Sequence, residues 1–128
     1  MYEYKIKEVV KVVDGDTIDI IVDLGFDLTK KERVRLVGID TPESRTKDLA
    51  EKELGLDAKD FLQRRMADCD NLWVRTEKDG KYGRMLGEIW CGVTNINDEM
   101  VSRGYAWVYD GGKKEKNLDD LRTIRGII

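Results

Sequence analysis

The sequence predicts one mainly β domain, a small closed or partly open β-barrel of five strands with about three helices packed against it. Three observations support this fold. The chain has 128 residues, 41% of them hydrophobic, and a single proline, which suits one compact domain over residues 1–128. Five segments have the patterns of strands, and a long helical pattern follows the third of them.

The five predicted strands share alternation or a composition rich in β-branched and aromatic residues. They cover residues 2–13, 16–24, 33–39, 71–77 and 85–91. Asp14-Gly15 joins the first two, and this dipeptide is favoured in two-residue type I′ hairpin turns. A polar turn over residues 25–31 leads to the third strand, which Thr41-Pro42 ends. We therefore expect two consecutive hairpins in this part of the chain.

Three helices are expected to cover the barrel. The first lies at residues 54–66, where apolar residues recur at helical spacing. These residues are Leu54, Ala58, Phe61, Leu62 and Met66. A short second helix is expected to start at Asn97, whose side chain can cap it, and to end at Gly104. Residues 118–128 have a weaker helical pattern.

The composition excludes several kinds of chemistry. Histidine is absent, which removes the usual general base, the usual zinc ligand and every Ser-His or Cys-His catalytic pair. Any catalysis must therefore use carboxylates, lysine, tyrosine or a metal ion. The net charge of −3 is a poor match for a globally basic nucleic-acid binder, so a basic binding surface would have to be local.

The termini and cysteines predict a cytoplasmic protein. The N-terminal residues MYEYKIKEVV lack the apolar region of a secretion signal, and no apolar stretch is long enough to span a membrane. Cys69 and Cys91 lack CxxC spacing, and a cytosolic setting would keep them reduced, so we expect two buried residues without a functional role.

Asp16 and Asp40 are the first candidates for a metal site. An antiparallel hairpin centred on residue 28 would place them opposite each other, with Cβ atoms about 4.5–5.5 Å apart. Both share the parity of neighbouring apolar residues, so they would face the mouth of the core. Two such carboxylates repel unless a hard cation such as Ca²⁺ neutralises them. The alternative is that each aspartate only builds or caps a turn.

Three more charged residues are candidates for the same site. Glu43 follows a rigid Thr-Pro and could orient and deprotonate a water molecule, although a single loop glutamate is more often only solvent-exposed. Arg35 and Arg84 carry guanidinium groups that match two phosphate oxygens; the alternative is surface salt bridging. Strict alternation places Arg35 on the opposite face from Asp40, so a bulge or strong coiling of the barrel would be needed.

Four stretches together resemble the staphylococcal nuclease (thermonuclease) family in order and spacing. They are VVDGDTIDI, RVRLVGIDTPES, DGKYGRMLGEIW and NDEMVSRGYAWVY, and they span about Val12 to Tyr109. The resemblance implies an OB-fold barrel with three helices. It also implies a Ca²⁺-dependent activity that hydrolyses the phosphodiester backbone of DNA and RNA. The lack of a secretion signal favours an intracellular or phage-encoded role.

The resemblance assigns roles to the acidic residues of this sequence. Asp16 and Asp40 would bind one Ca²⁺ ion through their side chains, and Thr41 would contribute its backbone carbonyl. Mg²⁺ or Mn²⁺ could also occupy such an all-oxygen site. Glu43 would handle the attacking water. The family therefore implies one metal ion per site.

The resemblance also implies how the substrate is held. Arg35 and Arg84 would bind the phosphate and stabilise its charge, Lys81 and Tyr82 would contact a terminal phosphate, and Tyr109 would stack on a base. The expected partner is single-stranded or frayed DNA, or RNA, bound by a monomer. The acidic net charge and the C-terminal segment LDDLRTIRGII depart from the family pattern.

Two other functions remain open from the sequence. One is a nuclease-like fold without activity that binds nucleic acid or protein. Degenerate copies of this domain usually lose site residues, whereas this chain keeps all five charged ones. The other is a barrel that binds Ca²⁺ only for structure, which gives no reason for Arg35 and Arg84 to accompany the carboxylates.

Overall fold

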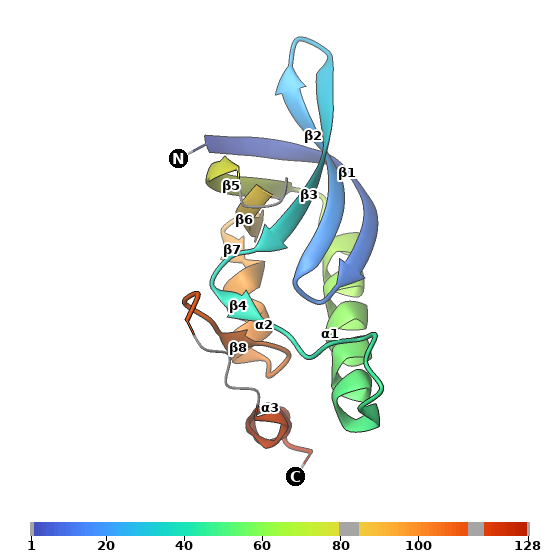
Figure 1. Ribbon diagram of the computed structural model, residues 1–128. Coiled ribbons are helices and arrows are strands. Elements are labelled where there is room, and N and C mark those ends of the chain that lie inside the picture. Colours follow the sequence, from blue (N-terminus) through green and yellow to red (C-terminus); the bar gives the residue numbers. More distant parts are fainter. Residues whose placement is uncertain (1, 80–84, 113–116, 128) are drawn as a thin grey trace.

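A closed barrel of five long strands forms the centre of the protein in the computed structural model, which describes residues 2–79, 85–112 and 117–127 (Figure 1). The strands are β1 (Tyr2–Asp14), β2 (Thr17–Gly25), β3 (Leu28–Leu36), β5 (Leu72–Asp79) and β6 (Met85–Cys91). They follow the order β3-β2-β1-β5-β6 with antiparallel pairing, and a parallel pairing of β3 with β6 closes the barrel. This confirms the predicted five-stranded OB-fold barrel.

Short strands and helices surround this barrel. β7 (Thr94–Asn95) pairs antiparallel with the end of β6. β4 (Ile39–Asp40) pairs with β8 (Trp107–Val108) in a separate two-stranded sheet. The helices of the described residues are α1 (Leu49–Ala67), α2 (Ile96–Ser102) and α3 (Leu118–Arg125). α1 packs along β1, and α2 packs on β6 (Figure 1). No helix in the described ranges is both long enough and apolar enough to cross a membrane.

The core follows the predicted alternation. Ile18, Ile20 and Val22 of β2 are almost completely buried. They pack in one cluster with side chains from the other long strands and from α1. α1 contributes Ala58 and Leu62 of its predicted apolar stripe, both fully buried. Burial of such aliphatic side chains provides most of the stabilisation of a domain of this size.

The turn between β1 and β2 differs from the prediction. Asp14 pairs with Thr17, so the turn residues are Gly15 and Asp16, and neither has the positive φ that a type I′ turn requires. Glycine is needed at position 15 because a side chain there would collide with neighbouring residues. A Cβ atom there would lie 2.8 Å from Ala58 Cβ and 3.1 Å from Thr41 Cγ2. The turn that carries Asp16 therefore packs directly against α1.

The second turn is also shorter than predicted. β3 begins at Leu28, so the polar turn expected over residues 25–31 is wrong. The turn consists of Phe26 and Asp27, with φ of 54° and 62°. Positive φ at both central residues is the type I′ arrangement, which phenylalanine rarely adopts, and this is why the sequence did not reveal it. The hairpin tip projects beyond the barrel (Figure 1).

The second helix is capped by a different residue from the one predicted. Asn95 caps α2, accepting a bond from the Asp98 N–H at 3.2 Å. Asn97 is buried and links two residues of β6 to Val37, which follows β3. Its side chain accepts from the Ile89 N–H and donates to the carbonyls of Val37 and Gly87. A buried amide with three bonds fixes the place where β6 meets the end of β3.

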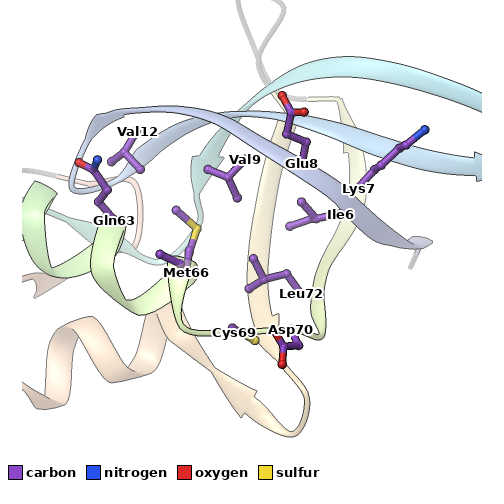
Figure 2. Close-up of a pocket in the computed structure, with 11 residues that line it drawn as sticks. Ile6, Lys7, Glu8, Val9, Val12, Gln63, Met66, Cys69, Asp70 and Leu72 are labelled. Carbon is purple, nitrogen blue, oxygen red and sulfur yellow. The ribbon is translucent and has the colours of Figure 1, made fainter.

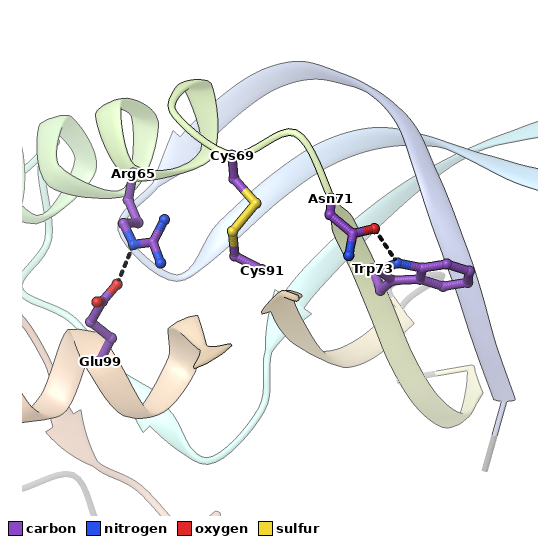
Figure 3. The surroundings of a disulfide bond; sticks show 6 residues. All are labelled: Arg65, Cys69, Asn71, Trp73, Cys91 and Glu99. Carbon is purple, nitrogen blue, oxygen red and sulfur yellow. Dashed lines mark hydrogen bonds and ion pairs between the residues drawn. A yellow bond between two sulfur atoms is a disulfide. The ribbon is translucent and has the colours of Figure 1, made fainter. Parts of the chain in front are cut away.

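Cys69 and Cys91 form a disulfide bond, so the expectation of two reduced cysteines is wrong (Figure 3). Their Cα atoms lie 6.1 Å apart. Cys69 follows α1, and Cys91 ends β6, where it pairs with Leu72. The two cysteines meet because α1 returns the chain to the start of β5, a tertiary arrangement that residue spacing alone does not encode.

A pocket of about 370 Å³ lies beside Cys69, between β1 and the C-terminal end of α1 (Figure 2). β1 pairs with β5 only over residues 2–5, and beyond this point the helix covers the barrel. Ile6, Met66 and Leu72 line the pocket. The disulfide therefore holds the end of α1 near the place where strand pairing stops.

Asp19 makes a pH-dependent contribution to stability. It is 8% exposed on β2, and Arg33 Nε and Nη2 donate to its two oxygens at 2.7 and 3.0 Å. The hydrogen bonds from Arg33 lower the pKa of this carboxyl below its usual value. The unfolded state therefore binds more protons than the folded state at acid pH, and this contribution is lost as the pH falls below about 4.

We expect Asp19→Asn to reduce stability at pH 7 and to flatten the acid limb of the stability profile below about pH 4. Urea unfolding at a series of pH values measures both effects. Asp70→Asn, at an exposed position, is the matched control and should leave the acid limb as in the wild type. An unchanged limb in Asp19→Asn would contradict the assignment.

Candidate functional site

Asp16, Arg35 and Asp40 meet at the end of the barrel where the β1–β2 turn lies. Arg35 Nη2 is 3.4 Å from Asp16 Oδ2 and 3.5 Å from Asp40 Oδ1. The side chains are 13%, 13% and 7% exposed in the order Asp16, Arg35 and Asp40. Arg35 Nη1 also donates to the Leu36 carbonyl at 2.7 Å. One guanidinium thus faces two carboxylates that are largely withdrawn from water.

These carboxylates come together by a different route from the predicted hairpin register. β2 pairs with β3 so that Thr17 lies opposite Arg35, which excludes the hairpin centred on residue 28. The carbonyl of Asp16 accepts from the Leu36 N–H at 2.8 Å, and Asp40 belongs to the separate strand β4. The prediction that Asp16 and Asp40 are cross-strand partners is therefore wrong.

The end of β3 at Leu36 explains how Arg35 and Asp40 can approach each other. β3 ends at Leu36, and the chain turns through Val37 and Gly38, whose φ is +82°, before β4 begins. A positive φ of this kind favours glycine. Residues 33–39 are therefore not one strand, and alternation does not carry over from Arg35 to Asp40. No bulge within β3 is needed to bring the two side chains together.

Both oxygens of the Asp16 carboxylate have further partners. The Thr41 N–H donates to Oδ2 at 3.3 Å, and the Thr17 hydroxyl donates to Oδ1 at 3.0 Å. Thr41 is 3% exposed. These bonds orient the carboxylate and hold residue 41 beside it. Asp16, Asp40 and Thr41 therefore lie beside one another.

The donor set suits a hard divalent cation. Two carboxylates and one guanidinium leave a net negative charge among these three side chains, and carboxylate and carbonyl oxygens are the ligands that Ca²⁺ and Mg²⁺ prefer. Among the described residues, no group of three or more Asp, Glu, Cys or His side chains lies close enough together to hold a metal ion. The side chains of Asp16 and Asp40, with the Thr41 carbonyl, fit an ion that keeps part of its shell as water.

Glu43 lies in the loop after Pro42 and is exposed. Its N–H donates to Glu51 Oε2 at 3.0 Å. The next residue, Ser44, is buried, and its hydroxyl donates to the Asp14 carboxylate. The sequence patterns assigned Asp14 only to a turn and assigned no role to Ser44 or Glu51. Their only signal was that Asp14 stands in the DGD motif and Ser44 in DTPES.

The remaining predicted residues are only partly placed. Lys81, Tyr82 and Arg84 lie outside the described residues. The N–H of Tyr109 donates to the Gly38 carbonyl at 2.8 Å, just after β8, in which Trp107 pairs with Asp40. The structure therefore brings the backbone of Tyr109 beside the strand that carries Asp40. Its stacking role stays a prediction.

Comparison with known proteins identifies similar chains. A family model described as "Staphylococcal nuclease homologue" matches residues 33–125. "Protein ParB" of Escherichia coli is 37% identical over 112 residues, which cover 80% of this chain and 56% of that protein. "Thermonuclease" of Staphylococcus hyicus is 33% identical over 103 residues, covering 77% and 56%. "Micrococcal nuclease" of Shigella flexneri is 35% identical over 114 residues, covering 80% and 57%. The chain thus spans little more than half the length of these relatives.

Proposed function

The chain belongs to the staphylococcal nuclease homologue family, and from this premise we propose that it is a metal-dependent nuclease that hydrolyses phosphodiester bonds of DNA or RNA with Ca²⁺ as its cofactor. One observation carries the proposal: Arg35 stands within 3.5 Å of both Asp16 and Asp40. The guanidinium group that would bind phosphate thus lies directly beside two candidate metal ligands.

The side chains of this site have separate tasks in the proposed reaction. Arg35 would bind a non-bridging phosphate oxygen and meet the negative charge that grows there as water attacks. Asp16, Asp40 and the Thr41 carbonyl would hold the divalent ion. When bound, that ion would add positive charge beside the phosphate. We assign Arg84 as a second phosphate ligand from its place in the family motif.

Glu43 would act on the attacking water. A carboxylate can accept a proton from a water molecule within hydrogen-bond reach. Lys81, Tyr82 and Tyr109 would hold a terminal phosphate and a base. Binding would then depend mainly on the backbone and on stacking, so base sequence would matter little. The net charge of −3 provides no long-range attraction for a polyanion, so binding would depend on local contacts to phosphates.

The nuclease proposal predicts that cleavage of single-stranded DNA requires both a divalent ion and Asp40. We expect wild-type protein to cut in Ca²⁺, to stop in chelator, and to lose about 10²-fold or more of its activity as Asp40→Asn. Asp60→Asn, which changes an exposed aspartate of α1, is the control. Ca²⁺ should also raise the melting temperature of the wild type but not of Asp40→Asn, because a ligand stabilises only the state that binds it.

The outcomes separate the candidate functions. Cleavage that continues unchanged both in chelator and in Asp40→Asn would contradict the metal mechanism. DNA binding without cleavage would favour the inactive binding module. A melting temperature that rises with Ca²⁺, in a protein that neither binds nor cuts DNA, would favour a structural ion.

A further inference from the structure

We propose that Asp14 and Ser44 are positioning residues, whose hydrogen bond holds the Glu43 loop against the turn that carries Asp16. The inference rests on the proposed nuclease function and deepens it. It assigns a task to two residues outside the predicted catalytic, metal-binding and substrate-binding set. Through this bond, the place of the Glu43 carboxylate would be fixed relative to the metal ligands.

The bond joins two segments that are distant in sequence. Asp14 ends β1 and stands two residues before Asp16, whereas Ser44 directly follows Glu43. The Ser44 hydroxyl donates to Asp14 Oδ1, and Ser44 is 4% exposed. A buried hydroxyl bonded to a carboxylate makes a directional, charge-assisted contact. This contact ties the loop of the candidate base to the turn of a candidate metal ligand.

A second bond fixes the other side of Glu43. Its N–H donates to Glu51, which lies in the first turn of α1. Asp48 caps this turn by accepting from the N–H groups of Ala50 and Glu51. The helix that supplies the Glu51 carboxylate is thus itself well defined at its start. Residue 43 is thus held by α1, and residue 44 is held by Asp14 beside the β1–β2 turn.

Gly55 provides the surface on which this loop lies. A Cβ atom at this position of α1 would be 2.4 Å from the Glu43 carbonyl oxygen and 2.7 Å from that of Pro42. Glycine is disfavoured inside a helix, and the close approach of the loop backbone explains its presence here. The loop therefore packs against α1 through backbone atoms, and the hydrogen bonds of Glu43 and Ser44 set its register on that surface.

Backbone position matters for Glu43 because it determines which region the exposed Glu43 carboxylate can reach. A general base must stay within hydrogen-bond reach of the water it activates, and a displacement of about 1 Å can cost about 10²-fold in rate. Loss of the Asp14–Ser44 bond would move or loosen residue 43 while leaving Arg35 on the phosphate. The expected signature is a lower kcat with a nearly unchanged KM.

The test measures kcat and KM on single-stranded DNA in Ca²⁺ for Ser44→Ala, Asp14→Ala and the double variant. We expect each single variant to lose about 10- to 100-fold in kcat. The double variant should lose no more, because the two residues act through one shared bond. Ser44→Thr keeps the hydroxyl and should recover most of the activity. Each variant should retain the Ca²⁺-dependent rise in melting temperature.

Two further variants distinguish positioning from general loss of stability. Glu99→Gln breaks the ion pair between Arg65 and Glu99, which joins α1 to α2 (Figure 3), and should leave kcat as in the wild type. Gly55→Ala disturbs the same loop from the α1 side and should lower kcat with KM nearly unchanged.

Wild-type kcat in Ser44→Ala, additive losses in the double variant, or failure of Ser44→Thr to recover activity would overturn the inference while leaving the nuclease proposal intact. A wild-type protein that does not cleave DNA would overturn both.

Discussion

Replacement of Arg35 by alanine is expected to reduce kcat/KM for DNA cleavage by about 10³-fold. Arg35 Nη2 lies within 3.5 Å of both Asp16 and Asp40, so the variant removes the positive charge that would bind the phosphate and that separates the two carboxylates. Steady-state kinetics on single-stranded DNA in Ca²⁺ measure the loss. Arg35→Lys keeps the charge without the planar fork and should recover activity only in part.

Arg33→Ala is the matched control for this prediction. Arg33 lies on the same strand, but it pairs with Asp19, and its side chain is 50% exposed. Its removal should alter acid stability and leave cleavage close to wild type. Comparable losses of activity in both variants would mean that β3 as a whole is disturbed. Full activity in Arg35→Ala would contradict the role of Arg35 in binding phosphate.

Loss of the disulfide is expected to lower the free energy of unfolding by about 3 kcal/mol. Cys69 and Cys91 are 22 residues apart in sequence, and linking them limits the conformations of the unfolded chain. Urea unfolding of the Cys69→Ser/Cys91→Ser variant measures the effect. Wild-type protein with a reducing agent should match the variant, and the reducing agent should not change the variant. Equal stability of oxidised and reduced wild type would contradict the prediction.

The disulfide also bears on where the protein works. The N-terminal sequence led us to expect a cytoplasmic protein, where thiols are kept reduced. The bond between Cys69 and Cys91 is instead typical of oxidising compartments. We propose that the oxidation state of this pair reports the compartment. Intact-mass measurement with and without thiol alkylation, on protein taken directly from its source, distinguishes the two.

The strands and the main helix could be predicted because hydrophobic periodicity determines them. Ile18, Ile20 and Val22 of β2 are buried as expected, as are the α1 residues Leu54, Ala58, Leu62 and Met66, whereas Leu24 is 41% exposed. The strand registers could not be predicted. A turn at Phe26-Asp27 has no common sequence signal, since phenylalanine seldom adopts a positive φ. This one turn moves Arg35, rather than Asp40, to the level of the β1–β2 turn.

The proximity of three candidate site residues could be predicted, but not the geometry that brings them together. The charged motifs identified Asp16, Arg35 and Asp40, and the structure brings these three together. Their approach depends on β4 and on the Gly38 turn, which are tertiary features. Asn97 shows the same limit. An asparagine near a helix start suggests a cap, whereas the buried side chain bonds two residues of β6 and the Val37 carbonyl just after β3.

The parallel pairing of β3 with β6 bears on the order in which the candidate site can form. The β1–β2 and β2–β3 hairpins join neighbouring segments, and such local contacts form quickly. Val34 pairs with Met85 across the intervening α1 and β5, so this contact has a larger cost in chain entropy. Arg35 lies at this junction, opposite Leu86. During synthesis, a nascent chain whose β6 is still inside the ribosome would therefore carry Asp16 and Asp40 but not a finished phosphate site.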